Sequence, residues 1–284
     1  MNKAGIEVFD GFGVEYPEYE VITPQSKQSY TIRTLTTEEE DVLKGSSISP
    51  SKLSRHVTDV LWKCIVKKPE SIKTYDDFIS NVTLKDRDAL LYGLYVASYK
   101  EIQKYNIICN DITCKFKNTV NINIEKGLNG KFWDPSEKFE FEGKEIQRDN
   151  ITKFRLSLTM PTFGHVTCVI KAPTIKDELS ITESDSFSDT EDINERMATA
   201  MIDKFIIGAL KNKPEEETFT QRSNIEKIYK KLPSKDKKYI VSSFNEVFKE
   251  YQVYVESIVK CQKCGKEQKV VLNIADEFFR ALYE

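Results

Sequence analysis

The sequence predicts an α+β protein made of two pseudo-repeated helical halves, each with short antiparallel strands and a cysteine hairpin. Two segments, 83–92 and 232–241, each begin a helical pattern, and each pattern runs into a pair of cysteines after a nearly equal length of chain. An alternating strand pattern follows each pair, so each pair is expected in the turn of a hairpin. Because helical patterns fill most of the remaining chain, we expect helices packed with small antiparallel sheets.

This internal similarity divides the chain into four expected segments. They are an N-terminal arm, a first repeat, an insertion and a second repeat, at residues 1–27, 28–126, 127–150 and 151–284. The second repeat includes an acidic loop over residues 177–196 and ends in a C-terminal helix. The arm, the insertion and the acidic loop show no clear helix or strand period, so they are expected to be irregular.

In the first repeat, a strand pattern over residues 30–35 precedes a short helix, because Thr36 and Glu39 have the spacing of a capping box. Ser49 and Pro50 are expected to start a longer helix. Its apolar residues recur at every fourth position, at Leu53, Val57, Leu61 and Ile65. Two more helices, from Tyr75 to Val82 and from Thr83 onward, lead to the first cysteine pair and a strand over residues 116–124.

The second repeat has a comparable order of patterns. It opens with a strand over residues 154–160, and the acidic loop then leads into a helix capped by Asp189. The apolar stripe of that helix is Ile193, Met197, Met201, Phe205 and Ile206. Helices that start near Asn224 and Pro233, a strand over 270–274 and a terminal helix over 274–283 complete the chain.

Charge and hydropathy exclude several classes of protein. The 284 residues carry a formal net charge of −3 at pH 7, so the chain lacks the global cationic field that non-specific nucleic-acid binding requires. No stretch approaches the roughly 20 apolar residues of a membrane span, and the N-terminus lacks the apolar core of a signal peptide. We therefore expect a cytosolic chain with no membrane partner, and the charge disfavours nucleic acid as a partner.

Four of the six cysteines form two close pairs. Cys109 and Cys114 have the spacing C-x4-C, and Cys261 and Cys264 the spacing C-x2-C. In a reducing compartment such pairs favour metal ligation over disulfides. Zinc takes four soft ligands in a tetrahedron, so we expect one structural zinc that joins the two halves. The alternatives are that the hairpins lie far apart without metal, or that each is a half-site completed by another chain.

The other reactive residues indicate no catalytic site. The two histidines, His56 and His165, have no nucleophile motif nearby, and the sequence has no P-loop, dinucleotide-binding or zinc-protease motif. Cys64 and Cys168 lie among apolar residues, as core cysteines do. A redox role for the second pair is disfavoured, because no βαβ pattern surrounds it. The sequence therefore predicts a protein that is not an enzyme.

Several motifs in order resemble one known family. Residues 30–40 (YTIRTLTTEEE), residues 84–95 (LKDRDALLYGLY) and the following cysteine pair are similar to the T4-like phage baseplate hub proteins, a family that includes hub-assembly factors of contractile-tailed phages. The second half resembles the family more loosely, through residues 232–233 and the second pair. The resemblance implies a non-enzymatic protein that builds or completes the tail baseplate hub by binding other hub or tail proteins.

The resemblance also implies a location, and one alternative function stays open. The protein would be made in the host cytoplasm during assembly, and its presence in the virion tail baseplate is not decided by the residues. The alternative is a phage regulator with a zinc ribbon that binds nucleic acid or RNA polymerase. Binding to DNA that weakens steeply with added salt would favour the regulator, whereas co-purification with tail proteins would favour the hub protein.

Overall fold

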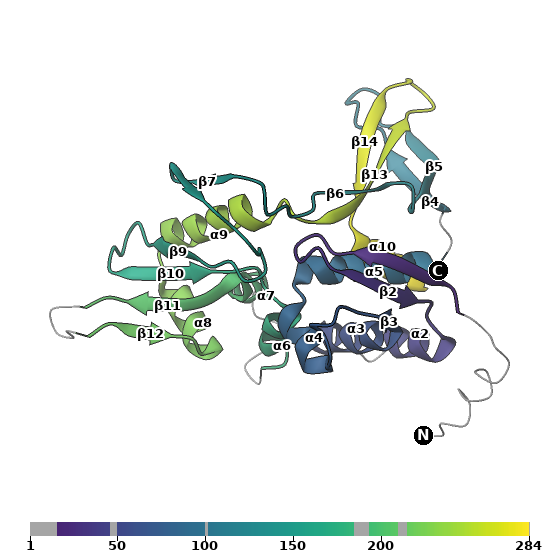
Figure 1. The fold of residues 1–284 in the computed structure, drawn as a ribbon. Helices are drawn as coiled ribbons and strands as arrows, with labels where there is room; N and C mark the ends of the chain where they lie inside the picture. The colour runs from purple at the N-terminus through teal and green to yellow at the C-terminus, as the bar shows by residue number, and fades with distance from the viewer. Residues whose placement is uncertain (1–15, 46–49, 100–101, 185–192, 210–214, 284) are drawn as a thin grey trace, which may run out of the picture.

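The computed structural model describes residues 16–45, 50–99, 102–184, 193–209 and 215–283. The chain is a mixed α+β protein with several small antiparallel sheets. Two lobes make up its body, and a pair of long β-hairpins projects from one of them (Figure 1).

The first lobe combines a three-stranded sheet with four helices. The strands, in the order β1-β2-β3, are Glu18–Ile22, Ser29–Arg33 and Ile65–Lys67. The helices α2 to α5 are Thr37–Lys44, Pro50–Cys64, Tyr75–Asn81 and Leu84–Ser98. Thr36 and Glu39 form both hydrogen bonds of the predicted capping box. Thr74 and Asp77 form a second capping box at α4, whereas α5 has a single cap, in which the Thr83 side chain accepts the N–H of Asp86.

Helix α5 packs closely against the first two strands. A Cβ atom placed on Gly93 would lie 2.2 Å from Cγ2 of Val21. Only glycine therefore allows the helix and strand β1 to approach to this distance.

The second lobe is a four-stranded sheet in the order β12-β11-β10-β9. Strands β9 to β12 are Leu156–Thr159, Val166–Ile170, Ile202–Ile207 and Glu217–Phe219. Helices α7, α8 and α9, at Ile193–Ala198, Arg222–Lys231 and Ser234–Phe248, accompany the sheet. Helix α6, Ile175–Thr182, instead contacts α3 and α4 of the first lobe.

The projecting hairpins come from distant parts of the chain. Strands β4 and β5, Ile102–Ile108 and Lys117–Asn123, form one hairpin, and β13 and β14, Val253–Lys260 and Glu267–Leu272, form the other. We call these four strands with their turns the hairpin module. Strand β6, Leu128–Gly130, adds to the edge of β13. A small hairpin of β7 and β8, Phe139–Phe141 and Lys144–Ile146, lies within the insertion.

The last helix, α10 at Ile274–Tyr283, matches the predicted terminal helix and returns to the first lobe. Its residues Ile274, Phe278 and Leu282 are buried in the core that also holds Leu90 and Leu94 of α5. The end of the chain therefore stabilises the lobe formed by its beginning.

The structure corrects several predicted elements. The predicted helix from Ile193 ends at Ala198, and Phe205 and Ile206 belong to strand β11. Pairing with β10 and burial of Phe205 in the second core outweigh the helical period there. Ile65 likewise begins β3 rather than extending α3. Asp189 and Ser49 lie outside the described residues.

The stretches expected to be irregular contain regular elements. Strand β1 lies in the arm, β6 to β8 lie in the insertion, and α6 covers the start of the predicted acidic loop. Helix α6 begins with a capping box between Thr174 and Asp177. The sequence analysis assigned Asp177 to the acidic loop and so did not identify this helix start. The short strands had too few residues to show a period.

Candidate metal centre

The hairpin module packs with the inner faces of its two hairpins against each other. Alternate residues are buried along β5 and β13, including Ile122 on the first hairpin and Val255 and Val259 on the second. This packing places the two turns at the same distal end of the module. All four paired cysteines lie in or beside these turns.

The four sulfur atoms form a compact group, with every pair within 4.8 Å. The Sγ atom of Cys109 lies 3.7 Å from that of Cys264, and the Sγ atom of Cys114 lies 3.8 Å from that of Cys261. A tetrahedral zinc ion with bonds of about 2.3 Å to sulfur separates its ligands by about 3.8 Å. The two short contacts fit that geometry, and both are far longer than a disulfide bond of about 2.0 Å. The group is therefore close enough to hold a metal ion.

The backbone of each turn is shaped to present both cysteines. The N–H groups of Cys109 and Cys261 donate to the carbonyls of Phe116 and Lys266, both at 2.9 Å, and so close the turns. The residue after the second cysteine is left-handed in each case, with φ of 45° at Lys115 and 73° at Gly265. Glycine adopts this conformation freely, whereas lysine does so at some cost.

Two amide side chains join the turns to each other in matching ways. The Oδ1 atom of Asn118 accepts from the backbone N–H of Gln262 at 2.8 Å, and the Oε1 atom of Gln268 accepts from the backbone N–H of Asn110 at 2.7 Å. Each amide lies on one hairpin and accepts from the backbone N–H of the residue that directly follows the first cysteine of the other hairpin. Asn118 also donates from Nδ2 to the Sγ atom of Cys261, 3.7 Å away. Such outer partners orient metal ligands.

These amides were missed by the sequence analysis. Each lies four positions after the second cysteine of its pair, a shared offset that a comparison of the two hairpins reveals. Both are buried, and a buried amide must find partners.

The electrostatic environment differs among the thiols. The pKa of Cys261 is lowered to about 6, mainly because its sulfur accepts a hydrogen bond from the backbone N–H of Cys264. A backbone hydrogen bond from Asp111 lowers the pKa of Cys109, but burial and the neighbouring thiols outweigh it and raise this pKa to about 12. Cys261 is therefore the residue best placed to supply a thiolate, the form that binds metal.

The remaining candidate residues lie elsewhere. Cys64 and Cys168 are buried in the two cores, as predicted, and burial raises the pKa of Cys64 to about 12. His56 is half-buried on α3, and His165 is exposed beside β10. Within the described residues, the four cysteines are the one group of three or more Cys, His, Asp or Glu side chains arranged to hold a metal ion.

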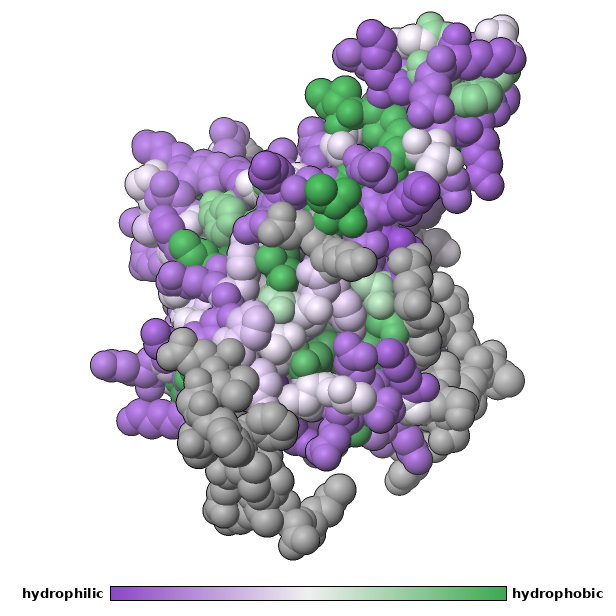
Figure 2. Space-filling model, turned by 90° about the vertical axis from the view of Figure 1, so that its right-hand side faces the viewer, coloured by the Kyte–Doolittle hydropathy of each residue, from purple (hydrophilic) through white to green (hydrophobic). Residues whose placement is uncertain are grey.

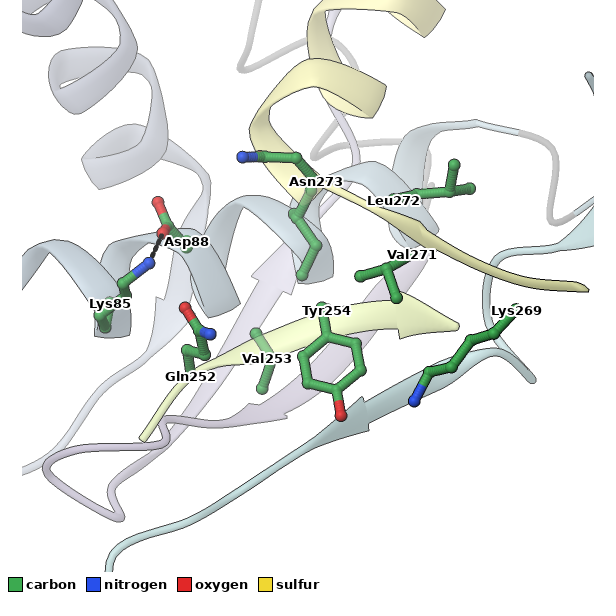
Figure 3. A pocket seen from close by; sticks show the side chains of 10 residues that line it. Lys85, Asp88, Gln252, Val253, Tyr254, Lys269, Val271, Leu272 and Asn273 are labelled. Carbon is green, nitrogen blue, oxygen red and sulfur yellow. Dashed lines mark ion pairs between the residues drawn. The ribbon is translucent and has the colours of Figure 1, made fainter. Parts of the chain in front are cut away.

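A hollow of about 370 Å³ lies at the base of the module, between α5, β13, β14 and the start of α10 (Figure 3). Its lysines have carboxylate partners: Lys85 lies 3.6 Å from Asp88, and Lys269 lies 2.6 Å from Glu256. The side chain of Asn273 caps α10 through the N–H of Ala275. The charged groups of Lys85 and Lys269 and the side-chain oxygen of Asn273 are therefore already paired within the protein.

Comparison with known proteins gives one result. A family model described as T4 bacteriophage base plate protein matches residues 16–280. No curated protein and no solved structure matches the chain. Among the described residues, no helix has both the length and the apolar character needed to cross a membrane.

Proposed function

The chain belongs to the T4 bacteriophage base plate protein family, and from this membership we propose that it is a non-enzymatic hub protein or hub-assembly factor of the tail baseplate. Membership of this family implies contacts with other phage structural proteins in the tail. The match over residues 16–280 is the observation that carries the proposal. The protein would act by binding hub or tail proteins in the host cytoplasm during assembly.

The arrangement of the cysteines supports a structural role for this part of the molecule. Four protein ligands leave no open coordination position, as in structural zinc sites and unlike catalytic ones. We propose that Cys109, Cys114, Cys261 and Cys264 hold one zinc ion. When bound, zinc would supply four metal–sulfur bonds that join two hairpins from opposite halves of the chain.

The proposed zinc can be tested by elemental analysis of the purified protein. About one zinc per chain is expected, and it should be lost when Cys261 is replaced by serine. The matched control is Cys64→Ala, because Cys64 is buried away from the cluster and its removal should leave zinc bound. Metal-free wild-type protein of unchanged stability would overturn the proposed zinc site.

We also propose that the two halves, predicted above at residues 28–126 and 151–284, are copies of one ancestral unit, and that the first copy also includes the preceding stretch from strand β1 onward. A matching pair of hydrogen bonds supports this. Asp86, in the first turn of α5, accepts the N–H of Gln25 at 2.7 Å, and Asp236, in the first turn of α9, accepts the N–H of Thr162 at 2.9 Å. Gln25 directly follows Pro24, which comes after strand β1, and Thr162 directly follows Pro161, which comes after strand β9.

The hub assignment is tested by affinity purification of a tagged chain from infected cells, followed by mass spectrometry. Other hub or tail proteins should co-purify at defined ratios, and loss of the chain should leave incomplete hubs. A parallel DNA-binding measurement at low and high salt addresses the regulator. Steeply salt-dependent DNA binding without tail proteins in the eluate would overturn the hub assignment.

A further inference from the structure

An apolar groove runs along the free edge of strand β1. It has a volume of about 220 Å³ and lies between β1, helix α5 and the segment around β6. We call it the β1 groove and define it by Tyr19, Val21, Ala89, Tyr92, Leu128 and Phe132. Figure 2 shows apolar surface where the projecting hairpin module meets the body of the protein. The groove is therefore an open, mostly apolar surface, and its buried residues Val21, Ala89 and Tyr92 are continuous with the core of the first lobe.

The backbone of β1 has hydrogen-bonding groups directed to this groove. Strand β1 pairs only with β2 among the described strands, in a register that places Glu20 opposite Thr31. The N–H of Thr34 donates to the carbonyl of Pro17, and the N–H of Thr23 donates to that of Gln28. In an antiparallel pair the bonded positions alternate.

It follows that residues 19 and 21 bond to β2 and that residues 18, 20 and 22 direct their N–H and C=O groups to the free edge. No described residue bonds to these groups. An unpaired strand edge is a template for another strand.

Side chains at the edge are exposed although several are apolar. Ile22 is 53% exposed, and Leu128 and Phe132 on the opposite wall are 36% and 37% exposed. The floor is formed by Ala89 and Tyr92 of α5, which are buried. An incoming strand would therefore place every second side chain on an apolar floor and the others on the outer face.

The negative charges on the outer face of β1 indicate which kind of segment can bind in the groove. Glu18 and Glu20 are both exposed there. In a symmetric pairing with a second copy of β1, glutamates would face glutamates, which is unfavourable. Residues 1–15 of the chain contain Glu7, Asp10 and Glu15 against Lys3, so they are also acidic. An extended segment with lysine or arginine opposite the two glutamates has the complementary charge.

We propose that the β1 groove binds an extended segment of another base plate protein, in which apolar residues alternate with lysine or arginine, by strand addition to β1. This proposal rests on the proposed hub function, because it names the chemistry of the partner. The apolar side chains would fill the groove, the basic ones would pair with Glu18 and Glu20, and the backbone would extend the sheet.

The experiment uses the full chain and short synthetic peptides in which valine alternates with lysine. A peptide of the same composition with its valines and lysines in two blocks is the first probe control, and an alternating valine and glutamate peptide is the second. The alternating basic peptide should bind, and both controls should bind at least about tenfold more weakly. Equal binding of the block peptide would overturn the proposal.

Substitutions at the edge separate strand addition from simple charge attraction. Ile22→Pro replaces the isoleucine side chain and removes the edge N–H, whereas Ile22→Ala shortens the side chain and keeps the N–H, so the proline variant should bind about fivefold more weakly than the alanine variant. Glu20→Lys should weaken binding of the basic peptide, and Glu145→Lys, on the distant hairpin of β7 and β8, should not. Equal affinities of the two Ile22 variants would overturn strand addition.

Other occupants give distinct results. If removal of residues 2–15 raises peptide affinity severalfold, the chain's own arm fills the groove and the proposal is wrong. If Ile22→Pro converts a dimer into a monomer, the occupant is a second copy and the proposal is again wrong. The peptide assay needs no other base plate protein. Failed peptide binding by a chain that co-purifies with tail proteins would therefore reject the groove and leave the hub assignment intact.

Discussion

The side-chain oxygen of Asn118 accepts a hydrogen bond from the backbone N–H of Gln262, a residue 144 positions further along the chain. Gln268 and Asn110 form the matching contact in the opposite direction, across 158 positions. These two bonds hold the cysteine-bearing turns in one orientation. They arise from buried amides beside the candidate metal centre.

Replacing Asn118 with alanine is expected to lower the free energy of unfolding by about 1 to 3 kcal/mol, because the N–H of Gln262 and the Sγ atom of Cys261 each lose a partner. Urea unfolding provides the measurement. Lys263→Ala is the matched control, since it lies in the same turn, leaves the N–H of Gln262 in place and changes an exposed side chain. If both variants unfold at the same urea concentration, the amide does not stabilise the turns.

Removal of the proposed zinc is expected to destabilise the hairpin module before either lobe. The cysteine ligands must lose their protons to bind zinc, so zinc should leave as the pH falls and protons compete for sulfur. Hydrogen exchange at residues 102–123 and 253–272, with and without chelator, would locate the effect. Unchanged protection of these residues after complete zinc removal would contradict it.

Asp86 is expected to make stability depend on pH. Burial raises its pKa to about 6, above the value of about 3.9 in an unfolded chain. Between these values the folded protein holds a proton that the unfolded chain has released. The contribution of Asp86 is therefore complete below about pH 4 and is lost as the pH rises through about 6. Its size is on the order of 2 to 3 kcal/mol.

The test compares wild type with Asp86→Asn by urea unfolding at several pH values from 4 to 7. The asparagine has no proton to exchange and keeps an oxygen for the N–H of Gln25, so it should remove this part of the pH dependence. Asp41→Asn, at an exposed position of α2, controls for the loss of one carboxylate. A variant with the same pH profile as wild type would show that Asp86 does not contribute.

Gly93→Ala is expected to destabilise the first lobe by about 1 to 3 kcal/mol, because the new Cβ would lie 2.2 Å from Cγ2 of Val21 and the helix must move. Thermal unfolding measures the loss. Val21→Ala in the same chain should recover part of it by making room, so the two substitutions should not be additive. Gly164→Ala is the control, since a Cβ there meets no atom within 4 Å.

Local signals in the sequence predicted most helices and several strands. The capping pair Thr36 and Glu39 starts α2, Thr83 caps α5, and the terminal helix has the predicted bounds 274–283. These signals act between residues three or four positions apart, so a single sequence contains them. Phe205 shows the limit, because its helical spacing from Met201 was overridden by a sheet partner in β10.

The sequence by itself determined which residues could form the metal centre, because cysteine is a specific ligand and the two pairs have characteristic spacings. Only the tertiary structure decided that Cys109 meets Cys264 and Cys114 meets Cys261, across 155 and 147 positions. The amides of Asn118 and Gln268 and the free edge of β1 were also decided there. The physical reason is that such contacts depend on how whole hairpins and helices pack, and no pattern within a few residues encodes that packing.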